Sequence, residues 1–113
     1  MGRFVKGDVV VVPFPFSDMT MSKRRPAFVV ADLAGDDLIL CQITSQNIRD
    51  EYAFVLNDSD FETGGLKRPS NIRPNRLFTA DRHIVQYKTG HLKNESIRNV
   101  IDALIALLKK GTV

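Results

Sequence analysis

The sequence predicts a small, mainly β protein: a compact β barrel that carries one C-terminal α-helix. Short runs of β-branched and apolar residues, separated by turn residues, recur through the first part of the chain. Near the end the apolar spacing changes to three and four residues, which is the period of an α-helix. A chain of 113 residues has room for one domain with a core, so we expect a single domain over residues 1–113.

The first two predicted strands flank a polar loop. Residues 8–12 are mostly valine, which favours a strand, and the proline-containing segment 13–16 ends it. A loop is expected over residues 17–24, and a second apolar strand over residues 27–33. Glycine and aspartate at 35–37 predict the turn that closes this strand.

The pair Arg25-Pro26 opens the second strand. The residue before a proline is held in an extended backbone, so the Arg25 guanidinium is expected at the beginning of a strand and not on a helix. The next strand, 38–44, is continuously apolar, which indicates burial on both faces, and it ends at Thr44 and Ser45. A permanently charged fork beside hydroxyl groups is suited to bind a phosphate and to stabilise negative charge that develops on it.

The chain between this strand and the helix alternates short strands and turns. Asparagine, aspartate and glycine over residues 57–65 predict turns, and Pro74 separates two short strands. Gly90 is expected to end the last strand. The short strands predicted here are 52–56, 70–73, 77–79 and 84–89. Many short strands with frequent turns are typical of a small barrel or sandwich.

The last segment predicts one amphipathic helix with a broad apolar face. The residues of that face are Ile97, Val100, Ile101, Leu104, Ile105, Leu107 and Leu108. Asn94 is the expected N-cap, because its side chain can accept a hydrogen bond from the first turn. Lys109 and Lys110 suit the negative end of the helix dipole, and Gly111 is expected to end the helix.

Composition indicates an ordinary globular protein. Hydrophobic residues make up 43% of the chain and charged residues 26%, which excludes a disordered or membrane composition. No apolar run approaches the roughly 20 residues that span a bilayer, and no signal peptide is visible, so we expect a cytoplasmic protein. The net charge of +3 is mild. Basic residues nevertheless cluster at 23–25 and at Lys67, Arg68, Arg73 and Arg76, which is compatible with a polyanionic partner.

The residues predict no metal site and no cofactor. The single Cys41 excludes an internal disulfide, and it lies inside an apolar run, so we interpret it as a buried hydrophobic residue. His83 and His91 lack the spacing of zinc ligands, and a structural role is favoured for each over a role as general base. The sequence contains no glycine-rich phosphate loop.

Several motifs, in this order, resemble those of the MazF/PemK family of toxin endoribonucleases. They are Gly7-Asp8-Val9-Val10, Arg25-Pro26, Ile43-Thr44-Ser45-Gln46, Ser70-Asn71-Ile72-Arg73 and Leu77-Phe78-Thr79-Ala80-Asp81. The resemblance covers nearly the whole chain, from the first motif through the C-terminal helix. The order and spacing of the motifs carry it more than any single motif does.

The resemblance implies an SH3-like β barrel, a homodimer, and a cognate acidic antitoxin as partner. It also implies cleavage of single-stranded RNA without a metal ion or cofactor. In this reaction the 2′-hydroxyl attacks the adjacent phosphate and leaves a cyclic phosphate and a 5′-hydroxyl. By position, Arg25 would contact the scissile phosphate and stabilise its charge, and Thr44 would donate a hydrogen bond to a phosphate oxygen.

The resemblance also implies further contacts to the RNA. The residues expected to make them are Lys23, Arg24, Ser45, Gln46, Arg73, Asn75 and, by stacking on a base, Phe16. Some family members pair an arginine at the position of Arg73 with an aspartate that acts as general base. That acid is Asn75 in this chain, and an amide cannot exchange a proton as a carboxylate does.

Two other functions stay open from the sequence. The same barrel is shared with a toxin class that poisons DNA gyrase by binding it, although Arg25-Pro26 and Thr44 favour the nuclease. A non-enzymatic barrel that binds nucleic acid or peptide is the second alternative, and the amide at Asn75 is the observation that favours it.

Overall fold

The computed structural model of the chain describes residues 3–15, 22–45 and 51–110. Within these ranges the strands are Asp8–Pro15 (β1), Ser22–Asp32 (β2), Asp37–Thr44 (β3), Phe54–Leu56 (β4), Phe61–Gly64 (β5), Ser70–Asp81 (β6) and Tyr87–Leu92 (β7). Two short 3-10 helices, η1 (Asp58–Asp60) and η2 (Arg82–Ile84), interrupt them, and the helix α1 spans Asn94–Lys110.

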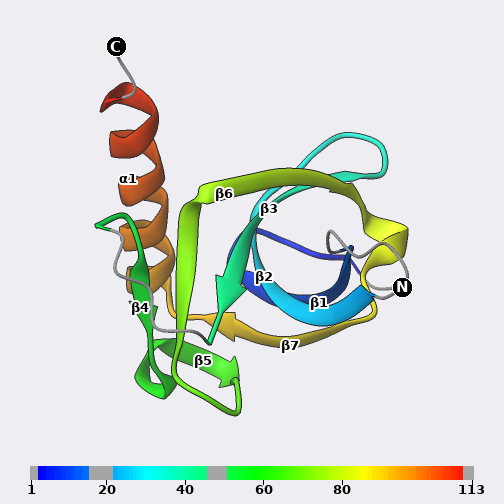
Figure 1. Cartoon of the computed structure of the whole chain (residues 1–113), viewed down its shortest axis with the longest axis horizontal. Helices are drawn as coiled ribbons and strands as arrows, with labels where there is room; N and C mark the ends of the chain where they lie inside the picture. The colour runs from blue at the N-terminus through cyan, green and yellow to red at the C-terminus, as the bar shows by residue number, and fades with distance from the viewer. Residues whose placement is uncertain (1–2, 16–21, 46–50, 111–113) are drawn as a thin grey trace.

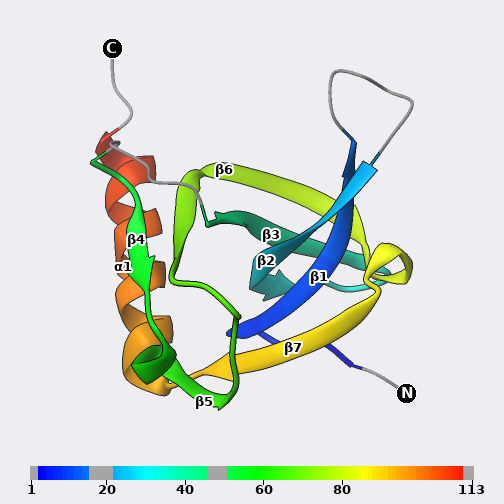
Figure 2. The ribbon, with the colours of Figure 1, turned by 60° about the horizontal axis from the view of Figure 1, so that its bottom comes forward.

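The strands form one antiparallel sheet in the order β4-β6-β3-β2-β1-β7-β5 (Figure 1). The sheet curls so strongly that β6 arches over β3 and β2, while β7 passes along the opposite side. α1 stands outside the curl, beside β4 and the bend of β6, in both views (Figure 2). This arrangement confirms the predicted fold class, a mainly β barrel with a C-terminal helix.

Buried side chains cover both faces of the sheet. One group lies on the side of α1 and comprises Val9, Phe28, Cys41, Ile43, Leu56, Phe61, Ile72, Leu92, Val100 and Leu104. The other lies inside the curl and comprises Val10, Val12, Ala27, Val29, Leu38 and Leu40. β3 contributes to both groups, which confirms the burial on both faces that its continuous apolar run predicted. Phe28 is fully buried, and truncating such a residue to alanine costs about 3–5 kcal/mol.

The β1–β2 hairpin is longer than the sequence predicted. The additional pairs are Pro13–Arg24, Phe14–Lys23 and Pro15–Ser22. Prolines are tolerated here because β7 pairs with β1 only as far as Val11, so the remainder of β1 has an open edge that needs no N–H donor. Residues 22–24 are therefore strand and not part of a loop, and the rest of the predicted loop, 17–21, lies outside the described residues.

The predictions for the middle of the sheet need two corrections. β5 lies within the segment 57–65, which was expected to contain only turns. β6 is one strand and not two, although its pairing with β3 is interrupted: three residues, Pro74–Arg76, lie between partners of the adjacent Cys41 and Gln42. Pro74 has no N–H donor, so the hydrogen bonding between β6 and β3 is interrupted there. The strand itself continues past this residue.

β7 and the start of α1 are also displaced from their predicted positions. β7 extends to Leu92, and Gly90 lies inside it, where a Cβ would come within 2.7 Å of the Thr63 carbonyl. Asn94 is the first helical residue and not the N-cap, because the Ile97 N–H donates to the carbonyl of Lys93 at 2.9 Å.

Two hydrogen bonds to Asp60 hold the beginning of α1 against η1. The Lys93 N–H donates to the Asp60 carbonyl at 2.8 Å, and Ser96 Oγ donates to Asp60 Oδ1 at 2.8 Å. The helix is thereby fixed at its first turn, and its apolar face packs over the outer side of the sheet. In the part of the chain that is described, no helix combines the length and apolar character that a membrane span requires.

Candidate functional site

Arg25 and Thr44 lie at the point where β2 and β3 part. Among the described residues, the pairing of these two strands ends at Ala27 and Gln42. Arg25 lies two residues beyond Ala27 on β2, and Thr44 lies two residues beyond Gln42 on β3. The two candidate catalytic residues therefore come from adjacent strands and lie just beyond the last paired residues of those strands.

Register places Arg73 on the same face of the sheet. Arg73 on β6 is opposite Gln42 on β3, and Gln42 is opposite Ala27 on β2. Residues directly opposite one another share a face, and so do residues two apart on one strand. Arg25, Thr44 and Arg73 are consequently on one face, the inner face of the curl where Ala27 is buried.

Burial of the three side chains differs in a way that suits anion binding. Thr44 is 4% exposed, whereas Arg25 and Arg73 are half-buried, and the Nε atom of each arginine is buried. When the Nε atom of an arginine is buried, its guanidinium has a more fixed orientation than the guanidinium of a fully solvated side chain. Two oriented cations and a hydroxyl are an arrangement that can bind a phosphate and stabilise added negative charge on it.

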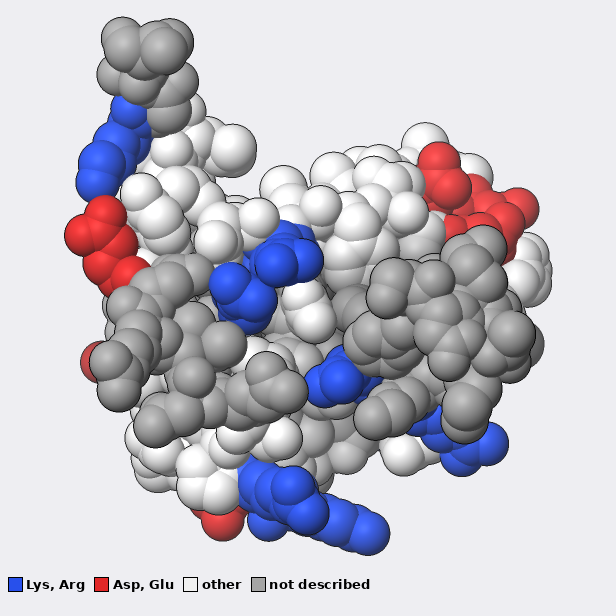
Figure 3. Space-filling model, in the orientation of Figure 1, with Lys and Arg blue, Asp and Glu red and all other residues white. Residues whose placement is uncertain are grey.

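The surface charge agrees with this arrangement. Lys and Arg side chains lie in the middle of the face shown in Figure 3, between β6 and β3 and beside β2. Asp and Glu side chains lie at the margins of this face, near the β2–β3 turn and beside the outer half of α1. A polyanion that approaches this face therefore meets positive charge at the centre.

The structure separates some of the residues that were predicted to bind substrate. Arg24 is exposed and alternates with Arg25 along β2, so it belongs to the opposite face. Ser45 is exposed directly after β3, and Asn75 is exposed in the interruption of β6. Phe16 and Gln46 lie outside the described residues, and Lys23 is described only by its place on β2.

Sequence reasoning missed two residues on the site face. Gln42 shares this face with Thr44, and Asn71 lies directly opposite Thr44 on β6. Gln42 is the polar residue that interrupts the apolar run of β3 two positions before Thr44, and this interruption was the available signal. For Asn71 the signal was weaker, because its proximity to Thr44 depends on a pairing between strands that are distant in the sequence.

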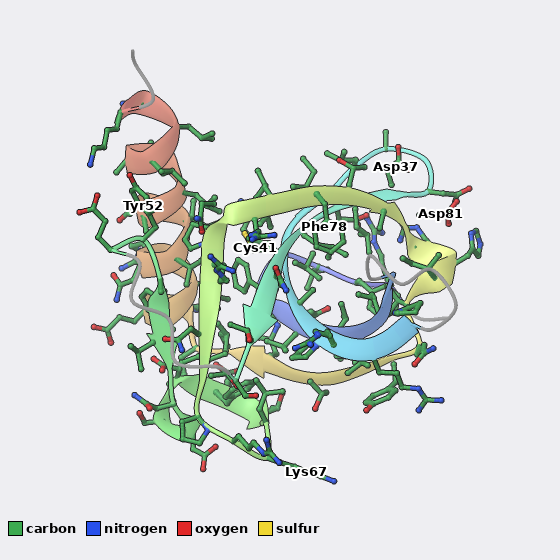
Figure 4. All side chains as sticks on the ribbon, viewed as in Figure 1. Asp37, Cys41, Tyr52, Lys67, Phe78 and Asp81 are labelled. Atoms are coloured by element: carbon green, nitrogen blue, oxygen red, sulfur yellow. The ribbon has the colours of Figure 1, made fainter. Side chains whose placement is uncertain are left out.

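Cys41 behaves as a core residue, as predicted, and Phe78 also packs against the core. Cys41 has no exposed surface, and burial raises the pKa of its thiol to about 12, which makes it a poor nucleophile. Phe78 is half-buried and packs against the inner core group. Figure 4 shows both side chains on the β3–β6 part of the curl.

Both histidines are paired with aspartates away from Arg25 and Thr44. His91 on β7 lies 2.8 Å from Asp8, and His83 on η2 lies 2.6 Å from Asp81. Hydrogen bonds from His83, first from its backbone N–H, lower the pKa of Asp81. The structure assigns neither histidine to the site of Arg25.

One group of metal-ligating residue types comes together in the described part of the chain, at the other end of β3. Asp36, Asp81 and His83 are exposed, and their ligand atoms lie within 4.8 Å of one another. Asp37 and Asp81 are close together in Figure 4 and are partners in the β3–β6 pairing. At about 3.3 Å per residue, the seven steps from Asp37 to Thr44 put this group roughly 23 Å from the site.

Neither of two pockets found among the described residues is lined by Arg25 or Thr44. The larger, of about 790 Å³, lies beside Arg3, Phe4, Asp32, Arg82 and His83. Its Arg82 is already bound to Asp32 at 2.7 Å and to the Gly35 carbonyl at 3.1 Å. The smaller, of about 290 Å³, lies between α1 and Tyr52 and Pro74.

The fold and the site together define a small protein that consists of one curled β-sheet with a cationic face and a C-terminal helix. Within this class, the chain belongs to the PemK-like, MazF-like toxin family of type II toxin-antitoxin systems, which it matches over residues 5–108. No curated protein matches the sequence significantly.

Solved structures of low sequence identity share the fold. An endoribonuclease in complex with its cognate antitoxin, from a Mycobacterial species, is 11% identical with a TM-score of 0.76, over 98% of this chain and 100% of that chain. MazE-MazF (Form-III) from Deinococcus radiodurans is 18% identical with a TM-score of 0.73, over 93% and 95%. The Mycobacterium tuberculosis toxin MazF-mt6 is 12% identical with a TM-score of 0.67, over 88% and 96%.

Proposed function

We propose that this toxin is an endoribonuclease that cleaves single-stranded RNA at selected sequences without a metal ion. The observation that carries the proposal is that Arg25 and Thr44 lie on adjacent strands just beyond the end of the β2–β3 pairing, with Arg73 on the same face. Membership of the toxin family and the shared fold of endoribonucleases support it.

The proposed reaction uses a nucleophile that the RNA itself supplies. The 2′-oxygen forms a bond to the adjacent phosphorus and loses its proton, while the bond from phosphorus to the 5′-oxygen breaks and that oxygen gains a proton. The products are a cyclic phosphate and a 5′-hydroxyl. Arg25 stabilises the charge that develops on the phosphate, and Thr44 donates a hydrogen bond to one of its oxygens. Arg73 helps to hold the phosphate in position.

Proton transfer is the weaker part of this site. A guanidinium is a poor general base, and Asn75 has no carboxylate that could act as one. The rate therefore depends mainly on positioning and charge stabilisation, and we expect modest turnover.

The proposed partners follow from the family and from the charge of the site. An acidic antitoxin segment is suited to cover the cationic face and to compete there with RNA. The active form is expected to be a homodimer, and cytoplasmic RNA is the expected substrate.

Expression of single variants tests the proposal. The parent protein should arrest growth and should leave DNA gyrase supercoiling unaffected, because its target is RNA. Arg25→Ala should abolish the arrest, and Thr44→Val, which keeps shape but removes the hydroxyl, should weaken it. Arg98→Ala, on an exposed position of α1, is the matched control and should stay toxic. Inhibition of supercoiling by the parent protein would instead support the gyrase-poisoning alternative.

A further inference from the structure

One row of residues crosses the site face from strand to strand and changes character along its length. Arg25 on β2 is followed by Thr44 on β3, by Asn71 on β6 and by Val55 on β4. Thr44 is directly opposite Asn71, and Asn71 is directly opposite Val55. The row therefore passes from a cation to a hydroxyl, then to an amide, and ends on an apolar residue at the edge of the sheet.

Val55 is the unexpected member of this row. Its neighbours on β4, Phe54 and Leu56, face the core beside α1, whereas Val55 faces the other way and is 60% exposed. Because side chains alternate along a strand, Val55 lies outside the core group that buries Phe54 and Leu56. An exposed apolar side chain beside a phosphate-binding pair is suited to contact the face of a base.

Asn71 is half-buried between Thr44 and Val55. Adjacent strands are about 4.8 Å apart, so Asn71 is one strand and Val55 two strands from a phosphate at Thr44. This spacing is of the size that separates a phosphate from the base of its own nucleotide. An amide presents a donor and an acceptor side by side, and it can make two hydrogen bonds to a base edge that offers the complementary pair, such as that of adenine.

We propose that Asn71 and Val55 form the base-recognition subsite next to the scissile phosphate, with Asn71 as the residue that selects the base. The inference rests on the proposed ribonuclease function, since it requires the phosphate to bind at Arg25 and Thr44. Val55 contributes contact with the ring face, which is similar for all bases, so it contributes affinity and little selectivity.

The test is a map of cleavage sites on a single-stranded RNA that contains a randomised region. The parent protein should show a preference at a position flanking the cut. Asn71→Ser should flatten the preference at that position by roughly tenfold or more, the size expected when a pair of hydrogen bonds to a base is lost, and should leave the other positions unchanged. Asn71→Asp, which offers only acceptors, should shift the preference toward a base edge with two donors.

Two further variants complete the design. Asn99→Asp makes the same chemical change on an exposed position of α1 and should leave the whole profile unchanged. Val55→Ser should raise KM several-fold on the preferred sequence and should not alter which base is preferred.

The outcomes separate this inference from the proposed function. If the parent protein cuts no RNA, the proposed function itself is wrong. If it cuts and both Asn71 variants keep the parental profile, the function stands and the base-recognition role is wrong. Folded Asn71→Ser and Asn71→Asp proteins that cut nothing would place Asn71 in the reaction itself and would also overturn its role in selecting the base.

Discussion

Asp8 and His91 join β1 to β7, its neighbour in the sheet. The Asp8 carboxylate is 1% exposed and lies 2.8 Å from His91 Nδ1, directly across the β1–β7 pairing. Its second oxygen accepts a hydrogen bond from the Val5 N–H at 2.9 Å. Lys88 on the same strand as His91 approaches the first oxygen at 3.8 Å. A buried carboxylate with these partners ties β1 to β7 next to the first turn of α1.

Removing this carboxylate should destabilise the fold without touching the site. Asp8→Ala leaves the His91 ring and the Val5 N–H without their shared acceptor, and we expect the free energy of unfolding to fall by about 1–3 kcal/mol. Urea denaturation measures this change. Asp102→Ala, at an exposed position of α1, is the control and should change stability by no more than about 0.5 kcal/mol. Equal stabilities of the two variants would contradict the role of Asp8.

Gly7 and Gly35 both have a positive φ angle. Comparing alanine variants at these two positions separates the cost of backbone strain from the cost of a packing clash. Gly7 has φ +98° and Gly35 has φ +79°, so alanine at either position costs about 1–2 kcal/mol in backbone strain. A Cβ at Gly7 would also lie 2.8 Å from Ile97 Cγ1, and Ile97 packs against the core, whereas a Cβ at Gly35 would meet nothing within 4 Å. Gly7→Ala should therefore be the more destabilising by about 1–3 kcal/mol in urea denaturation. Similar losses for both would show that Ile97 moves aside freely.

The ion pair between Asp32 and Arg82 predicts a pH dependence of stability. The hydrogen bond from Arg82 lowers the pKa of Asp32 below its ordinary value of 3.8, and Arg3 acts in the same direction. The folded state therefore favours the carboxylate. Its contribution is complete above the ordinary pKa and is lost as the pH falls through the lowered value.

A comparison with Asp32→Asn measures that contribution. The parent protein should exceed this variant in thermal stability at pH 6, and the difference should shrink as the pH is lowered below about 4. A difference that stays constant across this range would show that the charge of Asp32 does not matter.

Asn75 offers a gain-of-function prediction. A carboxylate at this position adds the general base that the site lacks, and such a base typically contributes about 10²–10⁴ in rate. Asn75→Asp should raise the rate of RNA cleavage at least about tenfold. It should also add a limb to the pH–rate profile, in which the rate rises as the new carboxyl group ionises.

The matched control for this prediction is Asn99→Asp, which adds the same charge on the exposed side of α1 and should leave rate and profile unchanged. An Asn75→Asp protein that is no faster than the parent, with no new limb in its profile, would show that position 75 does not reach the 2′-hydroxyl.

The fold could be predicted from the sequence wherever local pattern decides it. The valines of β1, the apolar run of β3 and the helical spacing of α1 each specify their element directly. The prediction was wrong where pairing overrides local preference. Pro13 and Pro15 read as a strand end, but β1 continues through them along an edge that β7 leaves open. Gly90 likewise lies within β7 because Phe61 and Thr63 approach its backbone closely.

The site was predictable only in part, for a related reason. Arg25 and Thr44 could be found from Pro26 and from the end of an apolar strand, both of which are local signals. Asn71 and Arg73 join them through the β3–β6 pairing, which is interrupted at Pro74 and cannot be placed in register from the sequence. Arg24 shows that strand alternation, and not proximity in sequence, decides which face a residue shares: it lies on the face opposite to that of Arg25, and its contact with RNA stays a prediction.

The most direct test of the central claim is incubation of the purified protein with a long single-stranded RNA in EDTA, followed by mapping of the product ends. We predict discrete cuts with cyclic-phosphate and 5′-hydroxyl ends. Arg25→Ala should lower the cleavage rate by about 10²–10³ while it keeps the parental melting temperature. Intact RNA, or cleavage that persists unchanged in Arg25→Ala, would contradict the account.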